Sequence, residues 1–590
     1  MTSRFATKTR FGANILDSGL TRFTLWAPDS AHVMLEIEGT APIPMRKKNG
    51  HFEVEAPFGA GTRYRFRVRP DLAVPDPASR AQAGDVHDAS LVIDPNAYEW
   101  RHPEWMGRPW HEAIIYELHV GAIGGFAAVT KMLPDLAALG ITAVELMPIN
   151  DFPGHRNWGY DGVLPYAPDA SYGTPDQLKH LIDTAHGLGL MVLLDVVYNH
   201  FGPDGNYLHT YSSPFFRKDM MTPWGEAIDF RRPEVRAFFI DNATLWLQEY
   251  RFDGLRFDAV HAFHDRDFLM EISRSVRTAI EPKRHVHLVL ENDDNDAEAL
   301  RQGFDAQWSD DGHHALHILL TGERTGYYAD YPDPAAALAR VLKEGFAYQG
   351  EASGHRGGER RGSFSGDLPP TAFVMFLQNH DQVGNRAFGE RLTVLANPAA
   401  LAAATLLLLM SPQIPLVFMG EEWGETKPFL FFTDHHGELA EKVREGRRRE
   451  FAQFADFADS ATRERIPDPN NPETFLSSVP ANASRWTPAQ QVTRAFYARL
   501  IALRSTHITP HLPGTQPIQA ETLGVNGVRA VWRLGNGAEL TIAVNFGAMT
   551  IPCAEGNGHC VAAVPDTAFS RGQLPGCSGA VWLSEPGGRS

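Results

Sequence analysis

Short apolar runs alternate with longer amphipathic segments through the middle of the chain. Eight runs have the length of buried strands, and they span residues 114–120, 143–149, 191–197, 254–260, 287–293, 304–310, 372–380 and 415–423. Between the second and third runs, the apolar residues from Leu178 to Leu188 keep the spacing of one helix face. Continuous apolar strands that alternate with helices are typical of a parallel sheet covered on both faces. Eight such units predict an α/β fold of the (β/α)8 TIM-barrel type.

The two ends of the chain follow a different pattern, in which apolar and polar residues alternate as in half-buried strands. The alternation is clear at residues 64–70, 528–534 and 539–546. We therefore predict an N-terminal β-sandwich of a carbohydrate-binding type over 1–100, a barrel with loop excursions over 101–485, and a helical connection with a small C-terminal β-sandwich domain over 486–590. Residues 350–366 are rich in Gly, Arg and Ser, so we expect a mobile excursion that packs no core.

The charge and composition of the chain exclude some classes of protein. Its 590 residues carry 54 Lys and Arg against 71 Asp and Glu, and the resulting net charge of -17 disfavours nucleic acid as a ligand. The N-terminus lacks the apolar core of a secretory signal, and no window reaches the ~20 apolar residues of a membrane span. We expect a cytoplasmic protein that binds neither nucleic acid nor a membrane.

Polar residues stand at the ends of four predicted strands, where barrel enzymes build their active sites. They are Asp195 with Asn199 and His200, Arg256 with Asp258, Glu291, and His380 with Asp381. One such carboxylate could simply cap the next helix, but four strands that converge on one mouth favour a common site. Carboxylates with an Arg and two His suit glycoside cleavage, which needs a nucleophile and a protonated acid. Trp158 and Tyr160 nearby offer apolar faces on which sugar rings could stack.

Four short segments resemble, in chain order, the motifs of the α-amylase family of glycoside hydrolases. They are DVVYNH at 195–200, GLRFDAVH at 254–261, LVLEND around Glu291, and QNHDQVGN at 378–385. The resemblance implies that Asp258 is the nucleophile and that Glu291 serves as acid and then as base. It also implies that Asp381 holds sugar hydroxyls and distorts the ring. A retaining double displacement of this kind predicts that the carboxyl groups of Asp258 and Glu291 lie about 5 to 5.5 Å apart.

The same resemblance implies the surroundings of these three carboxylates. Arg256 would keep Asp258 ionised, Asp195 would organise the pocket, and His200 and His380 would donate to hydroxyls of the same glucose. Asn199, Gln382 and Asn385 belong to the matching motifs and are expected to bind substrate. We expect no cofactor. The acidic run at 292–296 and the pair His313 and His317 are not taken as metal sites, and calcium held elsewhere, as in some amylases, stays an open alternative without support in the sequence.

Longer stretches at 310–328, 378–392 and 417–435 resemble a trehalose-releasing subgroup of this family. That subgroup hydrolyses the α-1,4 bond next to the terminal α,α-trehalosyl unit of malto-oligosyltrehalose, which a synthase supplies as its metabolic partner. Many amylases carry Lys-His after the nucleophile motif, whereas this chain has His261 and Ala262. We expect His261, Asp311, His313 and His314 to contact the trehalose end of the substrate.

Two other functions remain open at this stage. A glucan branching enzyme shares the same architecture and covalent intermediate but transfers the glycosyl group to a 6-hydroxyl. A protein that only binds glucan could use the same barrel without catalysis, although it would not need Asp258, Glu291 and Asp381 together.

Overall fold

The computed structural model describes residues 4–452, 459–482, 485–566, 569–570 and 572–586. Eight parallel strands close a barrel in chain order. Seven of them lie within the predicted runs, and the eighth begins one residue before its run, at Ile414. The eight strands are β10 (Ile115–Leu118), β11 (Ala143–Leu146), β14 (Met191–Val196), β17 (Gly254–Phe257), β18 (His287–Leu290), β19 (Ala306–Trp308), β22 (Phe373–Phe376) and β23 (Ile414–Phe418). The predicted TIM barrel is therefore confirmed.

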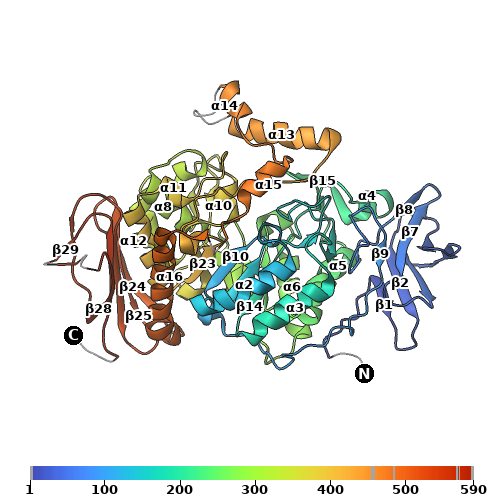
Figure 1. Cartoon of the computed structure of the whole chain (residues 1–590), viewed down its shortest axis with the longest axis horizontal. Coiled ribbons are helices and arrows are strands. Elements are labelled where there is room, and N and C mark those ends of the chain that lie inside the picture. Colours follow the sequence, from blue (N-terminus) through green and yellow to red (C-terminus); the bar gives the residue numbers. More distant parts are fainter. Residues whose placement is uncertain (1–3, 453–458, 483–484, 567–568, 571, 587–590) are drawn as a thin grey trace.

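Helices follow the strands and cover the outside of the barrel (Figure 1). The main ones are α2 (Phe126–Leu139), α3 (Pro175–Gly187), α5 (Pro233–Thr244), α6 (Arg266–Ala279), α8 (Asp310–Thr321), α9 (Pro334–Glu344), α12 (Pro398–Met410) and α16 (Pro488–His507). Helix α3 begins at a capping box formed by Thr174 and Gln177, which satisfies backbone N–H groups of its first turn. Its apolar face, which includes Leu178, Leu181 and Ile182, is buried as its spacing predicted.

Antiparallel β-sheets lie at the two ends of the molecule (Figure 1). Near the N-terminus, β1 (Gly12–Ile15), β2 (Thr21–Trp26), β6 (His51–Ala56) and β5 (Arg46–Lys48) form one sheet. Strands β4 (Ile43–Pro44), β3 (Met34–Ile37), β7 (Arg63–Arg69) and β8 (Leu72–Val74) form another, with β9 (Ser90–Leu91) paired to β7. The C-terminal sheet consists of β24 (Gln516–Thr522), β25 (Gly527–Arg533), β26 (Glu539–Asn545), β30 (Ser578–Leu583) and β28 (His559–Val564).

Buried polar contacts join these end regions to the barrel. Arg80, which follows β8, donates to Glu249 of the barrel at 2.8 Å, and both side chains are buried. At the other end, the guanidinium of Arg504 on α16 donates to the carbonyl oxygens of Leu409, Ser411 and Gln413. Because unpaired buried polar groups are costly, such contacts fix the end regions in one position on the barrel.

Ion pairs attach the Gly-rich segment 350–366 to the barrel. It forms a short hairpin of β20 (Glu351–Ala352) and β21 (Arg360–Arg361), and Arg361 is buried against Asp311 and Asp293. Arg356 of the same hairpin pairs with Asp293 and with Asp294. Arginines, and not an apolar core, thus attach this segment to the barrel. Within the described part of the chain, no helix combines the length and apolar character that a membrane crossing requires.

Candidate active site

The inside of the barrel changes from apolar to polar toward the C-terminal ends of its strands. Ile115, Ala143 and Leu193 belong to a buried apolar cluster inside the barrel. Successive side chains of a strand point to opposite faces, so the residue two positions further along also points inward. On three of the strands these residues are the buried acids Glu117, Glu145 and Asp195. A layer of ionisable groups therefore lies directly on the apolar core.

Arg256 on β17 is the centre of this layer. Its Nη1 donates to Asp195 Oδ2 at 2.8 Å and to Asp258 Oδ1 at 2.7 Å, and its Nη2 lies 4.0 Å from Glu291 Oε2. The guanidinium also lies 4.2 Å from the ring centre of Trp308, a cation–π geometry. Burial opposes the charge of Arg256, but Asp195 and the other carboxylates raise its pKa well above the ordinary value. A permanent positive charge therefore stands beneath Asp258.

Glu291 lies beside Asp258. The backbone N–H of Ala259, the residue after Asp258, donates to Glu291 Oε2 at 2.6 Å. Ala259 adopts φ +42°, a left-handed conformation that is costly for a residue with a Cβ. Burial raises the pKa of Glu291, Arg256 opposes this shift, and Asp258 adds to it. The site therefore holds one carboxylate paired with Arg256 beside a second carboxyl group, Glu291, whose protonated form burial favours.

Residues after β11 and β22 complete the inner part of the site. Tyr160 donates to Asp195 at 2.6 Å, and its oxygen lies 2.7 Å from Nε2 of His380. The ring of Tyr160 stacks on that of His380 with the centroids 5.2 Å apart. Asp381 is 40% exposed, lies 3.5 Å from the same Nε2, and accepts from Asn385. Asp381 and Asn385 are thus on the solvent side of the buried layer.

The other residues predicted to bind substrate near this layer lie around it. His200 bonds to Asn199 through Nδ1 and stacks on the exposed ring of Trp224, with the centroids 4.7 Å apart. His261 accepts from the backbone N–H of Asp293 and acts electrostatically on Glu291. Gln382 accepts from the hydroxyl of Tyr327, a residue that packs against His314.

Three predicted contacts are corrected by the structure. Asp311 is fully buried and its carboxylate accepts from Asn295, from Tyr331 and from two backbone N–H groups. His313 is buried against Phe376 and bonds to the carbonyl of Leu377. Trp158 is buried too, with its ring stacked on Phe429 and its N–H bonded to the carbonyl of Leu430. These three side chains support the walls of the site, because protein groups already occupy their polar atoms and ring faces.

The sequence argument also missed residues that the structure brings to the site. Glu117 contacts His380, and its charged side chain at an inward position of an apolar strand was a signal that could have found it. Asp310 adjoins Asp311 in sequence and lies within electrostatic range of Glu291 and Asp381. Trp224 comes from the hairpin of β15 (Phe216–Thr222) and β16 (Gly225–Ile228), and no pattern in the sequence indicated its position.

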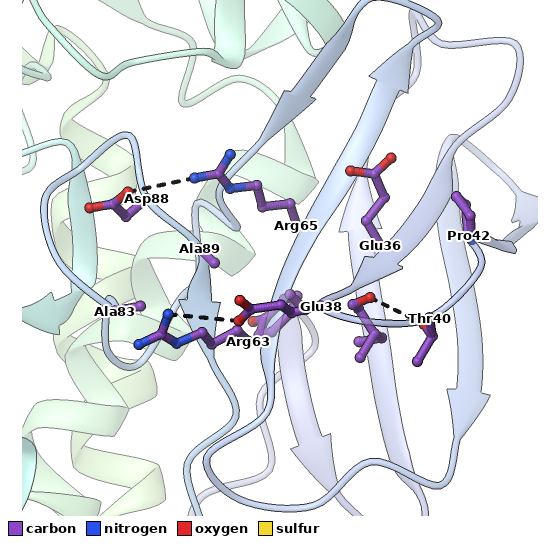
Figure 2. Close-up of a pocket in the computed structure, with 11 residues that line it drawn as sticks. Glu36, Glu38, Thr40, Pro42, Arg63, Arg65, Ala83, Asp88 and Ala89 are labelled. Carbon is purple, nitrogen blue, oxygen red and sulfur yellow. Dashed lines mark hydrogen bonds and ion pairs between the residues drawn. The ribbon is translucent and has the colours of Figure 1, made fainter.

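A second hollow lies on the N-terminal β region, away from these carboxylates. Figure 2 shows this cavity of about 560 Å³, which is lined by charged side chains of β3 and β7. Arg65 faces Asp88 and Arg63 faces Glu38, each pair at 3.7 Å. Its charges are thus matched in pairs, and it lacks the convergent carboxylates of the barrel mouth.

Comparison with known proteins agrees with this geometry. The family model "Alpha amylase, catalytic domain" matches residues 111–222, and a "Domain of unknown function (DUF3459)" matches residues 519–581. A crystal structure from Salmonella typhimurium, described as that of an alpha amylase, is 43% identical, has a TM-score of 0.92, and aligns over 98% of this chain and 100% of its own.

Curated relatives give a narrower family. The malto-oligosyltrehalose trehalohydrolase of Deinococcus radiodurans is 40% identical over 84% of this chain and 83% of its own length. The enzyme of the same name from Saccharolobus solfataricus is 41% identical over 77% of this chain and 82% of its own length. With the barrel, the end sheets and the converging carboxylates in place, the chain belongs to the malto-oligosyltrehalose trehalohydrolase family of α-amylase-type glycoside hydrolases.

Proposed function

We propose that this chain hydrolyses the α-1,4-glucosidic bond next to the terminal α,α-trehalosyl unit of malto-oligosyltrehalose and releases trehalose. The observation that carries the proposal is the joint placement of Asp258 and Glu291, one held by Arg256 and the other by the N–H of Ala259. Membership of the trehalohydrolase family supports the choice of substrate.

The reaction follows from the roles of these two groups. A carboxylate oxygen of Asp258 attacks the anomeric carbon of the glucose before the scissile bond, while Glu291 gives its proton to the bridging oxygen. Trehalose leaves, and the sugar stays attached to Asp258 as an ester. Glu291, now ionised, takes a proton from water, and the resulting attack releases the shortened malto-oligosaccharide with its anomeric configuration retained.

The surrounding residues assist these steps by charge and position. Arg256 orients the attacking carboxylate and balances its charge through a charge-assisted hydrogen bond. Asp381, His200 and His380 are proposed to hold the glucose that becomes attached to Asp258. His261, His314, Gln382 and Asn385 are proposed to contact the trehalose side. We further propose a cytoplasmic enzyme whose substrate comes from a synthase that converts the reducing end of malto-oligosaccharides.

The test is a comparison of two substrates. Purified protein is incubated with maltoheptaose and, separately, with a malto-oligosyltrehalose of similar length, and the products are separated by chromatography. We expect free trehalose from the second substrate and little action on the first. Branched or elongated products would instead make this chain a transferase, and equal cleavage of both substrates would make it a general amylase.

A further inference from the structure

Glu117 on β10 lies below the reacting carboxylates and takes no part in the mechanism above. It is 1% exposed and points into the barrel. Its Oε1 lies 2.6 Å from Nδ1 of His380, and its Oε2 accepts the backbone N–H of His380 at 3.1 Å. One carboxylate thus holds both the ring and the main chain of a single histidine, which fixes the orientation of that ring.

The hydrogen bonds around His380 also define its protons. Tyr160 gives its only hydroxyl proton to Asp195, so its oxygen can only accept from Nε2 of His380. Nδ1 faces the carboxylate of Glu117, which accepts there in the same way. Both ring nitrogens therefore carry a proton, which makes His380 an imidazolium.

We propose that Glu117 is a positioning residue that keeps His380 doubly protonated and in one orientation beneath the glucose that becomes attached to Asp258. The inference rests on the proposed function for the reaction, but the contacts themselves do not. From Glu117, hydrogen bonds run without a break through His380, Tyr160, Asp195 and Arg256 to Asp258. The position and charge of His380 are thereby coupled to the nucleophile.

The electrostatic surroundings of His380 agree with this arrangement. Burial alone would lower its pKa, but Asp381 and Glu117 raise the pKa to about 9. The charged and titratable groups that face His380 from the packed elements are Glu117, His119, Glu145, Tyr160, Asp195, Arg256 and Asp381. Among them Glu117 is the carboxylate that directly bonds to Nδ1.

Glu145 provides a matched control. It pairs in register with Glu117 on the neighbouring strand β11 and is also 1% exposed. Neither of its carboxyl oxygens has a hydrogen-bond partner within the described part of the chain. Burial raises its pKa well above the ordinary value, and Glu117 and Asp195 add to that shift. Burial therefore favours the protonated form of Glu145, and Gln is the closest replacement for that form.

The experiment compares Glu117→Gln with Glu145→Gln in the full-length enzyme, with kcat/KM for trehalose release measured against pH. A Gln amide offers one acceptor where Glu117 offers two, so His380 loses a partner and deprotonates at lower pH. We expect Glu117→Gln to lose roughly 10- to 100-fold in kcat/KM at pH 8, the size of a lost hydrogen bond to a charged group. The fall of kcat/KM that follows loss of the His380 proton should also move to lower pH in Glu117→Gln. Glu145→Gln should keep the wild-type profile. An unmoved limb in Glu117→Gln, or equal shifts in both variants, would overturn the proposal.

Two further measurements separate positioning from damage to the fold. If Glu117 acts through His380, the double variant Glu117→Gln with His380→Gln should lose no more activity than His380→Gln alone. Glu117→Asp keeps the negative charge on a shorter side chain. Its kcat/KM should therefore fall at a pH between those of the wild type and Glu117→Gln. Additive losses in the double variant would contradict the proposal.

A readout that needs no catalysis uses protein with ¹⁵N-labelled histidine. The His380 signals, assigned by their loss in His380→Gln, should remain those of an imidazolium up to pH 8 in the wild type and should titrate below pH 8 in Glu117→Gln. A neutral His380 in the wild type at pH 7 would refute the inference, whereas failure to release trehalose would refute only the proposed function.

Discussion

Arg256 determines the charge state of the site. It is completely buried, and a buried cation is tolerated only where anions surround it. Asp195 and Asp258 supply that charge at hydrogen-bond distance. Asp258 is therefore part of the counter-charge that lets Arg256 stay buried. Replacing Asp258 affects both the reaction and the charge balance around Arg256.

Asp258→Asn should remove turnover and keep substrate binding. The amide retains the shape of the side chain but cannot form the glycosyl ester, so we expect kcat to fall by on the order of 10⁴-fold or more. Turnover is measured by trehalose release and binding by calorimetric titration with malto-oligosyltrehalose. Asp88→Asn, on the remote N-terminal region, serves as the control and should behave as wild type. Full activity in Asp258→Asn would mean that another group forms the covalent intermediate.

The raised pKa of Glu291 fixes the direction of the pH dependence. Burial stabilises its protonated form, so Glu291 stays a proton donor above pH 4.5, the ordinary pKa of this side chain. As pH rises through the shifted pKa, the proton is lost and kcat/KM should fall. The measurement is a pH profile of trehalose release at low substrate concentration. Glu291→Gln should lose this limb together with most of its activity and should keep only the later fall set by His380, whose pKa is about 9. If kcat/KM of the wild type already falls at or below pH 4.5, burial does not raise the pKa of Glu291.

Single residues also show what the sequence could and could not reveal. Asp258, Glu291 and Asp381 interrupt or end apolar strands, and their motifs match a known family, so they were predictable. Asp311 was assigned to the substrate from the resemblance to the trehalose-releasing subgroup, but α8 begins at Asp310. Consecutive helical residues point about 100° apart, and only the packing of α8 decides which one faces the site. Glu117 was missed because it lies inside an apolar run.

At the scale of elements, the hairpin of β20 and β21 shows how charge replaces an apolar core. Arg361 donates to the carbonyl of Asp293 at 2.7 Å and to the hydroxyl of Tyr331 at 2.9 Å, and it pairs with Asp311 at 3.1 Å. Strand positions were predictable because a repeating apolar pattern specifies them locally. The attachment of this hairpin was not, because it depends on carboxylates far away in the sequence.

Arg361→Met should release the hairpin from the barrel. Asp311 and Tyr331 would lose a buried cationic partner, so we expect a loss of roughly 3 kcal/mol in the free energy of unfolding. Limited digestion with trypsin, followed by mass spectrometry, should show faster cleavage after Arg356, a site that this variant and its control both retain. The control is Arg360→Met, since the Arg360 side chain is exposed and bonds only to the carbonyl of Gly350 among the described residues. Equal digestion and stability in both variants would argue against ionic attachment.

At the scale of the whole molecule, buried charged side chains connect the barrel to the regions at its two ends. Glu249 accepts from Arg80 at 2.8 Å and from the hydroxyl of Thr7 at 2.8 Å, and it lies 3.9 Å from Nζ of Lys179 on α3. The N-terminal region is thereby connected to the barrel through a site from which water is excluded.

Glu249→Gln should loosen this connection. Arg80 and Lys179 would be left buried without their counter-charge, and we expect a loss of about 3 kcal/mol in the free energy of unfolding. Glu38→Gln removes an exposed carboxylate that pairs with Arg63, and its cost should stay below about 1 kcal/mol. Urea unfolding followed by circular dichroism measures both. A cost below 1 kcal/mol for Glu249→Gln would show that the two regions do not depend on this contact.

The barrel closes by pairing its first strand with its last, and this order governs when the enzyme can become active. Glu117 and His380 are 263 residues apart in the chain. Strand β10 reaches its second neighbour, β23, only after that strand has emerged from the ribosome. Contacts so distant in sequence form late in folding. A nascent or truncated chain that ends before β23 can therefore already contain every reacting carboxylate and still lack the enclosed layer that aligns them, so activity reports completion of the barrel.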